Sequence, residues 1–136
     1  MLTLTDARNL LNTKFAAWIR DLNLAVETLS PSSARLVLPY SERLSRVGGT
    51  VCGLALMACA ETAMVIAVSS ALGEFRNMTT IGQTISFMRP IANSDVMIEA
   101  RVLKLGRSIV FGEVSMMAAG QDAVAAHATT SYASIT

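Results

Sequence analysis

The spacing of apolar and polar residues changes along the chain, and it first predicts a helix. Apolar side chains recur at helical spacing within residues 5–20, and either Thr5 or Asp6 can cap the start of that helix. We therefore predict an N-terminal helix that occupies residues 1–21. The apolar positions that support it are Leu10, Leu11, Phe15, Trp18 and Ile19.

Strands are predicted for most of the remaining chain. Apolar side chains alternate there with polar ones, which is typical of a sheet with one buried and one exposed face. The clearest case places Glu99 and Arg101 between apolar residues from Val96 to Val102. Gly, Pro, Asn and Ser supply turns between the segments. The six predicted strands are 22–29, 34–40, 78–88, 95–105, 108–118 and 123–135.

Between the second and third predicted strands lies 50-TVCGLALMACAETAMVIAVSSAL-72, which would be apolar on every side as a helix. Gly73 is a favourable residue to end it. Such a helix needs cover on all sides, which a curved antiparallel sheet and a second copy of the chain can provide. The pattern predicts an α+β fold with a central helix at 50–72, in a single domain that spans residues 1–136.

The segment 50–72 is also about long enough to cross a bilayer. Against a membrane span, it is rich in small residues, Glu61 stands near its midpoint, and no cluster of Lys or Arg flanks it. The amphipathic strands around it favour a core helix instead. The N-terminus lacks the basic segment of a signal peptide. We therefore predict a cytoplasmic protein without membrane association.

Composition limits the classes of function. The chain is 52% hydrophobic and 15% charged with a net charge of +1, which argues against nucleic acid as a partner and favours self-association. Cys52 and Cys59 would lie two helical turns apart, roughly 10 Å, too far for a disulfide, so both are predicted to be reduced. The single His127 cannot build a metal site with them, and no metal is expected.

Glu61 is the one charged residue among the twenty-three residues of 50–72. Its helical neighbours are apolar, so we expect it to be buried, and burial would disfavour its ionised form. A core acid bonded to a strand is one interpretation, but carboxylates in such surroundings cluster at functional sites. Gly53 stands eight residues earlier, near the helix start, where free N–H groups stabilise an oxyanion. The pair suits hydrolysis of an activated carbonyl, with Glu61 as general base or nucleophile.

Three sequence segments resemble those of a known protein family. The segments 48-GGTVCGLALMACAETAM-64, 84-TISFMRP-90 and 103-LKLGR-107 resemble hotdog-fold acyl-CoA thioesterases of the phenylacetate-degradation (PaaI-like) type. The resemblance covers roughly residues 35–135. It implies a curved antiparallel sheet around a central helix, sites at a dimer interface, and dimers that often pair into tetramers. It also implies an acyl-CoA substrate that carries its own coenzyme A, with no separate cofactor.

The family pattern is His-Gly-Gly with the acid eight residues after the first Gly. Gly48 and Gly49 match the letters but lie thirteen and twelve residues before Glu61. Cys52-Gly53 matches the spacing, although Cys replaces His and Leu54 replaces the second Gly. Because spacing fixes where the helix begins relative to the acid, the resemblance makes the Gly53 N–H the oxyanion donor. Cys52 then takes the His position, and Gly48-Gly49 border the pocket.

The resemblance also assigns substrate contacts. It implies that Thr80 of a partner subunit positions water and that Arg89, Arg107 and Ser108 contact the CoA nucleotide. Near Glu61, Met57 and Met64 are candidates for the wall of the acyl pocket.

Two other functions stay open. A non-catalytic acyl-CoA or acyl-carrier binding module of the same fold is compatible with the missing His-Gly-Gly. A hotdog dehydratase would need a His–acid pair, and the chain has no histidine near the helix start. The sequence thus predicts an acyl-CoA thioesterase first and a binding module second.

Overall fold

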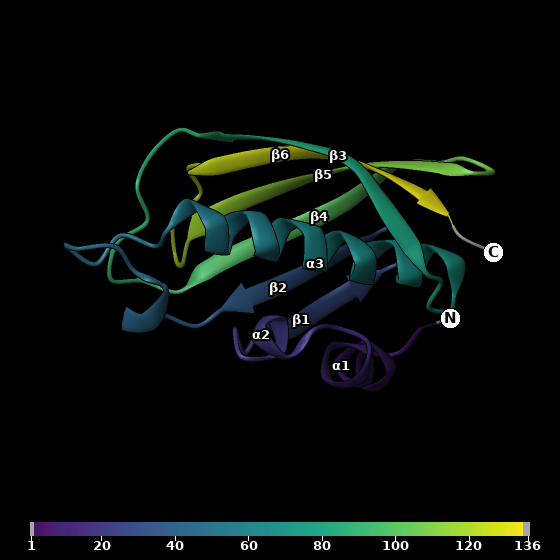
Figure 1. The fold of residues 1–136 in the computed structure, drawn as a ribbon, viewed down its shortest axis with the longest axis horizontal. Coiled ribbons are helices and arrows are strands. Elements are labelled where there is room, and N and C mark those ends of the chain that lie inside the picture. The colour runs from purple at the N-terminus through teal and green to yellow at the C-terminus, as the bar shows by residue number, and fades with distance from the viewer. Residues whose placement is uncertain (1, 135–136) are drawn as a thin grey trace.

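The computed structural model describes residues 2–134, which form a curved antiparallel sheet around one long helix (Figure 1). The six strands follow the order β1-β2-β4-β5-β6-β3. This is the predicted α+β hotdog arrangement, which is thereby confirmed. The strands are β1 Ala25–Ser30, β2 Ser33–Leu38, β3 Met78–Phe87, β4 Val96–Leu105, β5 Ile109–Ala118 and β6 Ala126–Ser134. The helices are α1 Leu4–Thr13, α2 Ala17–Arg20, the short 3-10 helix η1 Glu42–Leu44 and α3 Gly53–Leu72.

The central helix α3 begins later than predicted, because Thr50 and Val51 are extended and pair with the chain near Ile91 and Ala92. Thr50 forms a β-bridge with Ala92, and the Val51 N–H donates to the Ile91 carbonyl at 2.9 Å. At the other end Gly73 stops the helix in the left-handed conformation, with φ of 79°. Only glycine adopts that conformation readily, so the predicted end of the helix is confirmed.

The sheet covers α3 on all but one side. Side chains spaced three or four residues apart form an uncovered stripe, which consists of Leu54, Met57, Glu61 and Val65. Leu54 is 77% exposed, whereas most other side chains of α3 are buried against the sheet. The helix is long and apolar enough to cross a membrane, but 72% of its most apolar window is buried inside this fold. The uncovered stripe is therefore the part of the helix that is free to meet a ligand or another chain.

The N-terminal region is two helices, so the prediction of one continuous helix over residues 5–20 is wrong. The cap is Thr3, whose side chain accepts from the Asp6 N–H while the Asp6 carboxylate accepts from the Thr3 N–H. Helix α1 ends at Thr13, and α2 starts at Ala17 after a short break. Asn and Thr are weak helix formers, and the break lets the second helix take its own direction against the core.

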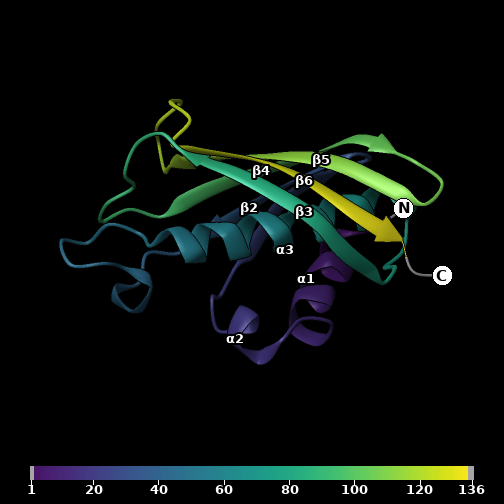
Figure 2. The same cartoon turned by 45° about the horizontal axis from the view of Figure 1, so that its top comes forward.

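The strands lie close to their predicted positions, except that the first begins at Ala25 and the last at Ala126. Ile135, predicted to belong to the last strand, lies outside the described residues. Strand β3 forms an edge of the sheet and runs over α3 (Figure 2). A bulge between Thr80 and Gly82 breaks its alternation. As a result Thr80 and Gln83, three residues apart, both reach the helix.

Candidate active site

Glu61 lies on the uncovered stripe of α3, and its side chain is exposed in the single chain. The expected burial of Glu61 is therefore wrong for one chain, because the sheet does not cover this side of the helix. The Thr80 hydroxyl on β3 donates a hydrogen bond to Oε1 of Glu61. The residue that was predicted to act from a partner subunit thus holds the acid of its own chain. One turn earlier on the helix, Gln83 Nε2 donates to the Met57 carbonyl at 3.5 Å.

The backbone at Glu61 is also held from β6. Tyr132 is 1% exposed, and its hydroxyl donates to the Glu61 carbonyl at 3.4 Å. Burial raises the pKa of Tyr132, so the phenol stays neutral and remains a donor. Tyr132 is not among the site residues predicted from the sequence. The available signal was a tyrosine at an inward position of a strand, since a buried hydroxyl needs a partner.

The first turn of α3 presents free backbone donors. Cys52 is the N-cap, and its side chain makes no capping bond. Within residues 2–134, the N–H groups of Gly53 and Leu54 have no hydrogen-bond acceptor. Such groups, together with the positive end of the helix dipole, form a site for an oxyanion. The Phe87 ring covers Gly53 so closely that its Cζ lies 3.0 Å from where a Cβ on Gly53 would stand.

A cavity of about 960 Å³ lies over the uncovered stripe. Its α3 side includes Cys52, Met57 and Glu61, and Gln83 of β3 contributes as well. This volume is at the upper end of the range for small-molecule pockets, about 300–1,000 Å³. A carboxylate held by one hydrogen bond therefore stands beside a space large enough for an organic ligand.

The rest of the cavity wall comes from segments that the sequence analysis did not connect with Glu61. Trp18 of α2, Tyr40 after β2, and Arg43 of η1 all line it. Trp18 and the Tyr40–Arg43 segment are far from α3 in the sequence, and no periodicity relates them to Glu61. Arg43 is an arginine of the cavity itself, whereas the predicted CoA contacts Arg89 and Arg107 do not line it.

The predicted substrate contacts divide into two groups. Cys52 and Met57 line the cavity. Met64 is fully buried, and its terminal methyl packs against the backbone of Gly112 on β5, so its predicted place in the pocket is wrong. Gly48 and Gly49 form the turn that leads to α3, with φ of 98° and 83°, and neither lines the cavity.

Arg89 lies at the opposite end of the sheet from Arg107 and Ser108. Arg89 follows β3, close to the start of α3, whereas the other two lie in the turn between β4 and β5. All three are exposed. The ten residues of β3 span about 33 Å, so one chain cannot bring both arginines to one nucleotide.

The two cysteines differ in their surroundings. Both are free, as predicted. Cys52 is half-buried at the cavity, whereas Cys59 is fully buried, and burial raises the pKa of its thiol to about 12 with a smaller contribution from Cys52. Cys59 is therefore a neutral core side chain and cannot act as a nucleophile.

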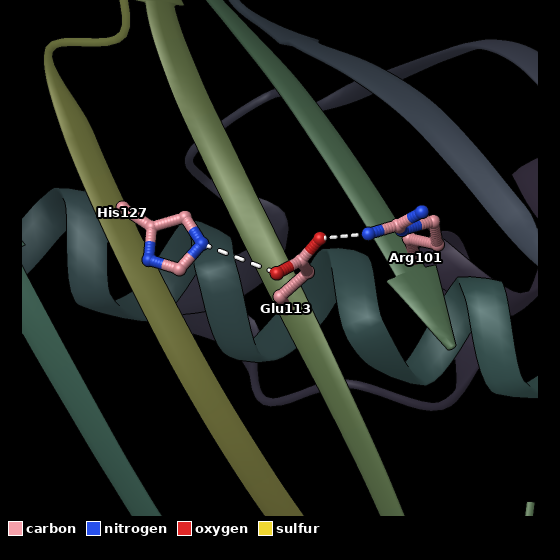
Figure 3. Close-up of polar contacts among 3 residues, drawn as sticks. All are labelled: Arg101, Glu113 and His127. Atoms are coloured by element: carbon pink, nitrogen blue, oxygen red, sulfur yellow. Dashed lines mark hydrogen bonds and ion pairs between the residues drawn. The ribbon is translucent and has the colours of Figure 1, made fainter. Parts of the chain in front are cut away.

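His127 lies on the face of the sheet that points away from α3 (Figure 3). Its Nε2 is 3.4 Å from Oε2 of Glu113, whose other oxygen accepts from Arg101. The Arg101 guanidinium, and then His127, hold the pKa of Glu113 below its usual value. His127 thus has an acidic neighbour on the adjacent strand β5. The sheet nevertheless separates this His–Glu pair from the cavity, so it does not supply the His–acid pair of a dehydratase site.

A curved sheet around a core helix, with an acid on the open side of that helix and free N–H groups at its start, defines a hotdog protein of the thioesterase type. The family model described as "Thioesterase superfamily" matches residues 48–132, which is more than half of the chain. The chain belongs to this family.

Individual proteins are similar to this chain in sequence and in structure. A Halobacterium salinarum protein named "putative esterase" is 34% identical over 101 residues, which are 71% of this chain and 66% of that protein. The crystal structure of a "putative thioesterase" from Silicibacter sp. matches with a TM-score of 0.89 and 26% identity, over 100% of this chain and 94% of that one. Zebrafish thioesterase superfamily member 2 matches with a TM-score of 0.88 over 100% of both chains, and at 18% identity this likeness concerns the fold alone.

Proposed function

We propose that the protein is an acyl-CoA thioesterase, which hydrolyses the thioester bond to a free acid and CoA. The observation that carries the proposal is the Glu61 carboxylate, oriented by Thr80 beside a cavity of about 960 Å³, in a member of the thioesterase superfamily. Cys52 and Met57 of the same helix face would contact the substrate.

In the proposed reaction Glu61 is a general base. It takes a proton from water, and the water oxygen forms a bond to the thioester carbonyl carbon. The negative charge on the carbonyl oxygen is stabilised by a Gly53 N–H. The carbon–sulfur bond then breaks, and the proton held by Glu61 goes to the leaving thiolate. If Glu61 instead attacks directly, an acyl–glutamyl anhydride forms, CoA leaves, and water then cleaves the anhydride.

Glu61 and Gly53 of one chain are poorly placed to act on a single thioester. Eight residues of straight helix separate them, which corresponds to about 12 Å, whereas the carbonyl carbon and oxygen are only about 1.2 Å apart. We therefore infer that a second copy supplies the helix start that faces each Glu61. The edge strand β3 suits this contact. Within residues 2–134 it pairs with β6 alone, and Ile81, Phe87 and the following Met88 are exposed. A tetramer built from two such dimers stays a prediction.

The first test replaces the acid. Glu61→Gln keeps the shape and the Thr80 contact but cannot accept a proton, so we expect kcat to fall by about 10²–10⁴-fold for every acyl-CoA that the wild type cleaves. Thermal unfolding should not change, because the side chain is exposed. The matched control is Glu74→Gln, which removes an exposed carboxylate outside the cavity.

The outcome separates the two candidate functions. Retained turnover in Glu61→Gln would contradict the proposal. If the wild type binds acyl-CoA without any turnover, and the affinity survives Glu61→Gln, the protein is a binding module.

A further inference from the structure

Helix α2 holds the single tryptophan of the chain away from the core. It is four residues long, and hydrogen bonds from Ile19 and Arg20 to the Ala16 carbonyl, at 3.0 and 3.1 Å, fix its turn. Ile19 packs against the core and Leu22 is buried, whereas Trp18 is 61% exposed. Tryptophan carries a large apolar surface that proteins usually bury, so this exposed ring is expected to have a partner.

The ring of Trp18 lines the same cavity as Glu61. The α3 side of this cavity follows the helix from Cys52 to Glu61, about 14 Å of helix. Tyr40, which is 38% exposed, lines the cavity from the loop after β2. The cavity thus combines a proposed reaction centre with two aromatic side chains from outside α3. Apolar and aromatic walls with a few polar groups are typical of pockets that bind apolar ligands.

The chain that follows Trp18 is also anchored to the core. Leu22 is 4% exposed, and the Leu22 N–H donates to the Ile19 carbonyl at 3.0 Å. Asn23 then turns the chain into β1 in the left-handed conformation, with φ of 58°. The ring is therefore presented from an anchored turn, so its place in the wall is defined before a ligand arrives.

Building on the proposed thioesterase function, we propose that residues 17–23 form one wall of the acyl pocket and that Trp18 determines acyl specificity. The substrates are CoA esters whose acyl group has an apolar body that reaches the Trp18 ring. Medium-chain and aromatic acyl-CoAs are accordingly preferred over acetyl-CoA, because an acetyl group has nothing to place against the ring.

Since Trp18 is the only tryptophan, its fluorescence reports directly on this wall. Glu61→Gln protein is titrated with CoA, acetyl-CoA, decanoyl-CoA and phenylacetyl-CoA, and binding is measured in parallel by calorimetry. We expect a saturable shift of the emission to shorter wavelength with decanoyl-CoA and phenylacetyl-CoA, and none with CoA. Decanoyl-CoA that binds without changing the emission would overturn the proposal.

A kinetic experiment tests specificity in the wild-type background. Trp18→Ala should lower the ratio of kcat/KM for decanoyl-CoA to kcat/KM for acetyl-CoA by about tenfold or more. The fall should come from a higher KM for decanoyl-CoA. Trp18→Phe should restore most of the ratio. The control is Phe111→Ala, which removes an exposed aromatic ring that does not line the cavity. An unchanged ratio in Trp18→Ala, or an equal drop in Phe111→Ala, would contradict the role of Trp18.

The two proposals fail in different ways. Suppose the wild type cleaves acyl-CoAs, but the Trp18 emission does not shift and Trp18→Ala leaves the kcat/KM ratio unchanged. Then only the proposal that Trp18 lines the acyl pocket is wrong. If Trp18 emission responds to decanoyl-CoA but no ester is cleaved, the thioesterase function is wrong and the wall belongs to a binding site. If no acyl-CoA binds or is cleaved, both are wrong.

Discussion

The carboxylate of Glu61 is held at one oxygen and free at the other. Thr80 donates to Oε1, and Oε2 has no hydrogen-bond partner among residues 2–134. A carboxylate oxygen without a donor is the position from which a proton can be taken from water. Thr80 would therefore orient the acid, and this role differs from the predicted direct contact with water across an interface.

Replacement of Thr80 by valine tests this orienting role. Valine keeps the β-branched shape that strands favour but removes the donor, so folding should be retained. A hydrogen bond to a charged group is worth about 1.5–3 kcal/mol, and we expect kcat to fall by about tenfold or more. Thr80→Ser keeps a hydroxyl and should stay close to the wild type. Equal rates for the valine and serine variants would show that Thr80 acts only as a strand residue.

In the proposed mechanism, helix α3 supplies the oxyanion donor from its first turn as well as the acid Glu61. Cys52 has φ of −70° and ψ of 146°, a conformation that suits the residue before proline. Proline is also well accepted at the first position of a helix. Gly53 can therefore be replaced by proline, which deletes its N–H while the helix start is kept.

We expect Gly53→Pro to lower kcat by about 10²–10³-fold, the usual effect of removing one oxyanion donor. Gly53→Ala is the control, because its Cβ displaces the exposed Phe87 ring in the same way but its N–H remains. Steady-state kinetics on one acyl-CoA, with thermal unfolding of both variants, distinguishes them. If alanine is as damaging as proline, the crowding at Phe87 explains the loss and the N–H does not.

The sequence was most informative where one element alone determines the pattern. A continuous apolar run predicted α3, alternation predicted the strands, and the spacing from Gly53 to Glu61 predicted where the helix begins relative to the acid. Features that depend on packing between elements were missed or wrong. Examples are the break after α1, the buried place of Met64, and the position of Trp18 in the wall of the cavity that Glu61 also lines. The bulge in β3 that directs Thr80 and Gln83 toward α3 also has no local signature in the sequence.

For the whole molecule, the separation of Gly53 from Glu61 makes a prediction about mixed assemblies. In a dimer of one Glu61→Gln chain and one Gly53→Pro chain, one site carries both defects and the other carries neither. Co-expression should therefore recover about a quarter of the wild-type activity in the unfractionated protein, because half of the dimers are mixed and each has one intact site. Mixed dimers purified through two affinity tags should have about half of the wild-type activity. Each variant alone should be almost inactive. Absence of recovery in tag-purified mixed dimers, or a monomer in solution, would contradict a site shared by two chains.

Leu54 is 77% exposed at the start of a helix that is otherwise mostly buried, and a newly made chain displays it to every other protein in the cell. In the proposed assembly a second chain limits this exposure, and two chains must first collide. Assembly is then second order in chain concentration, while aggregation and degradation compete for unassembled chains. At low expression the yield of working enzyme should rise more steeply than the rate of synthesis, so gene dosage would act on activity as a threshold.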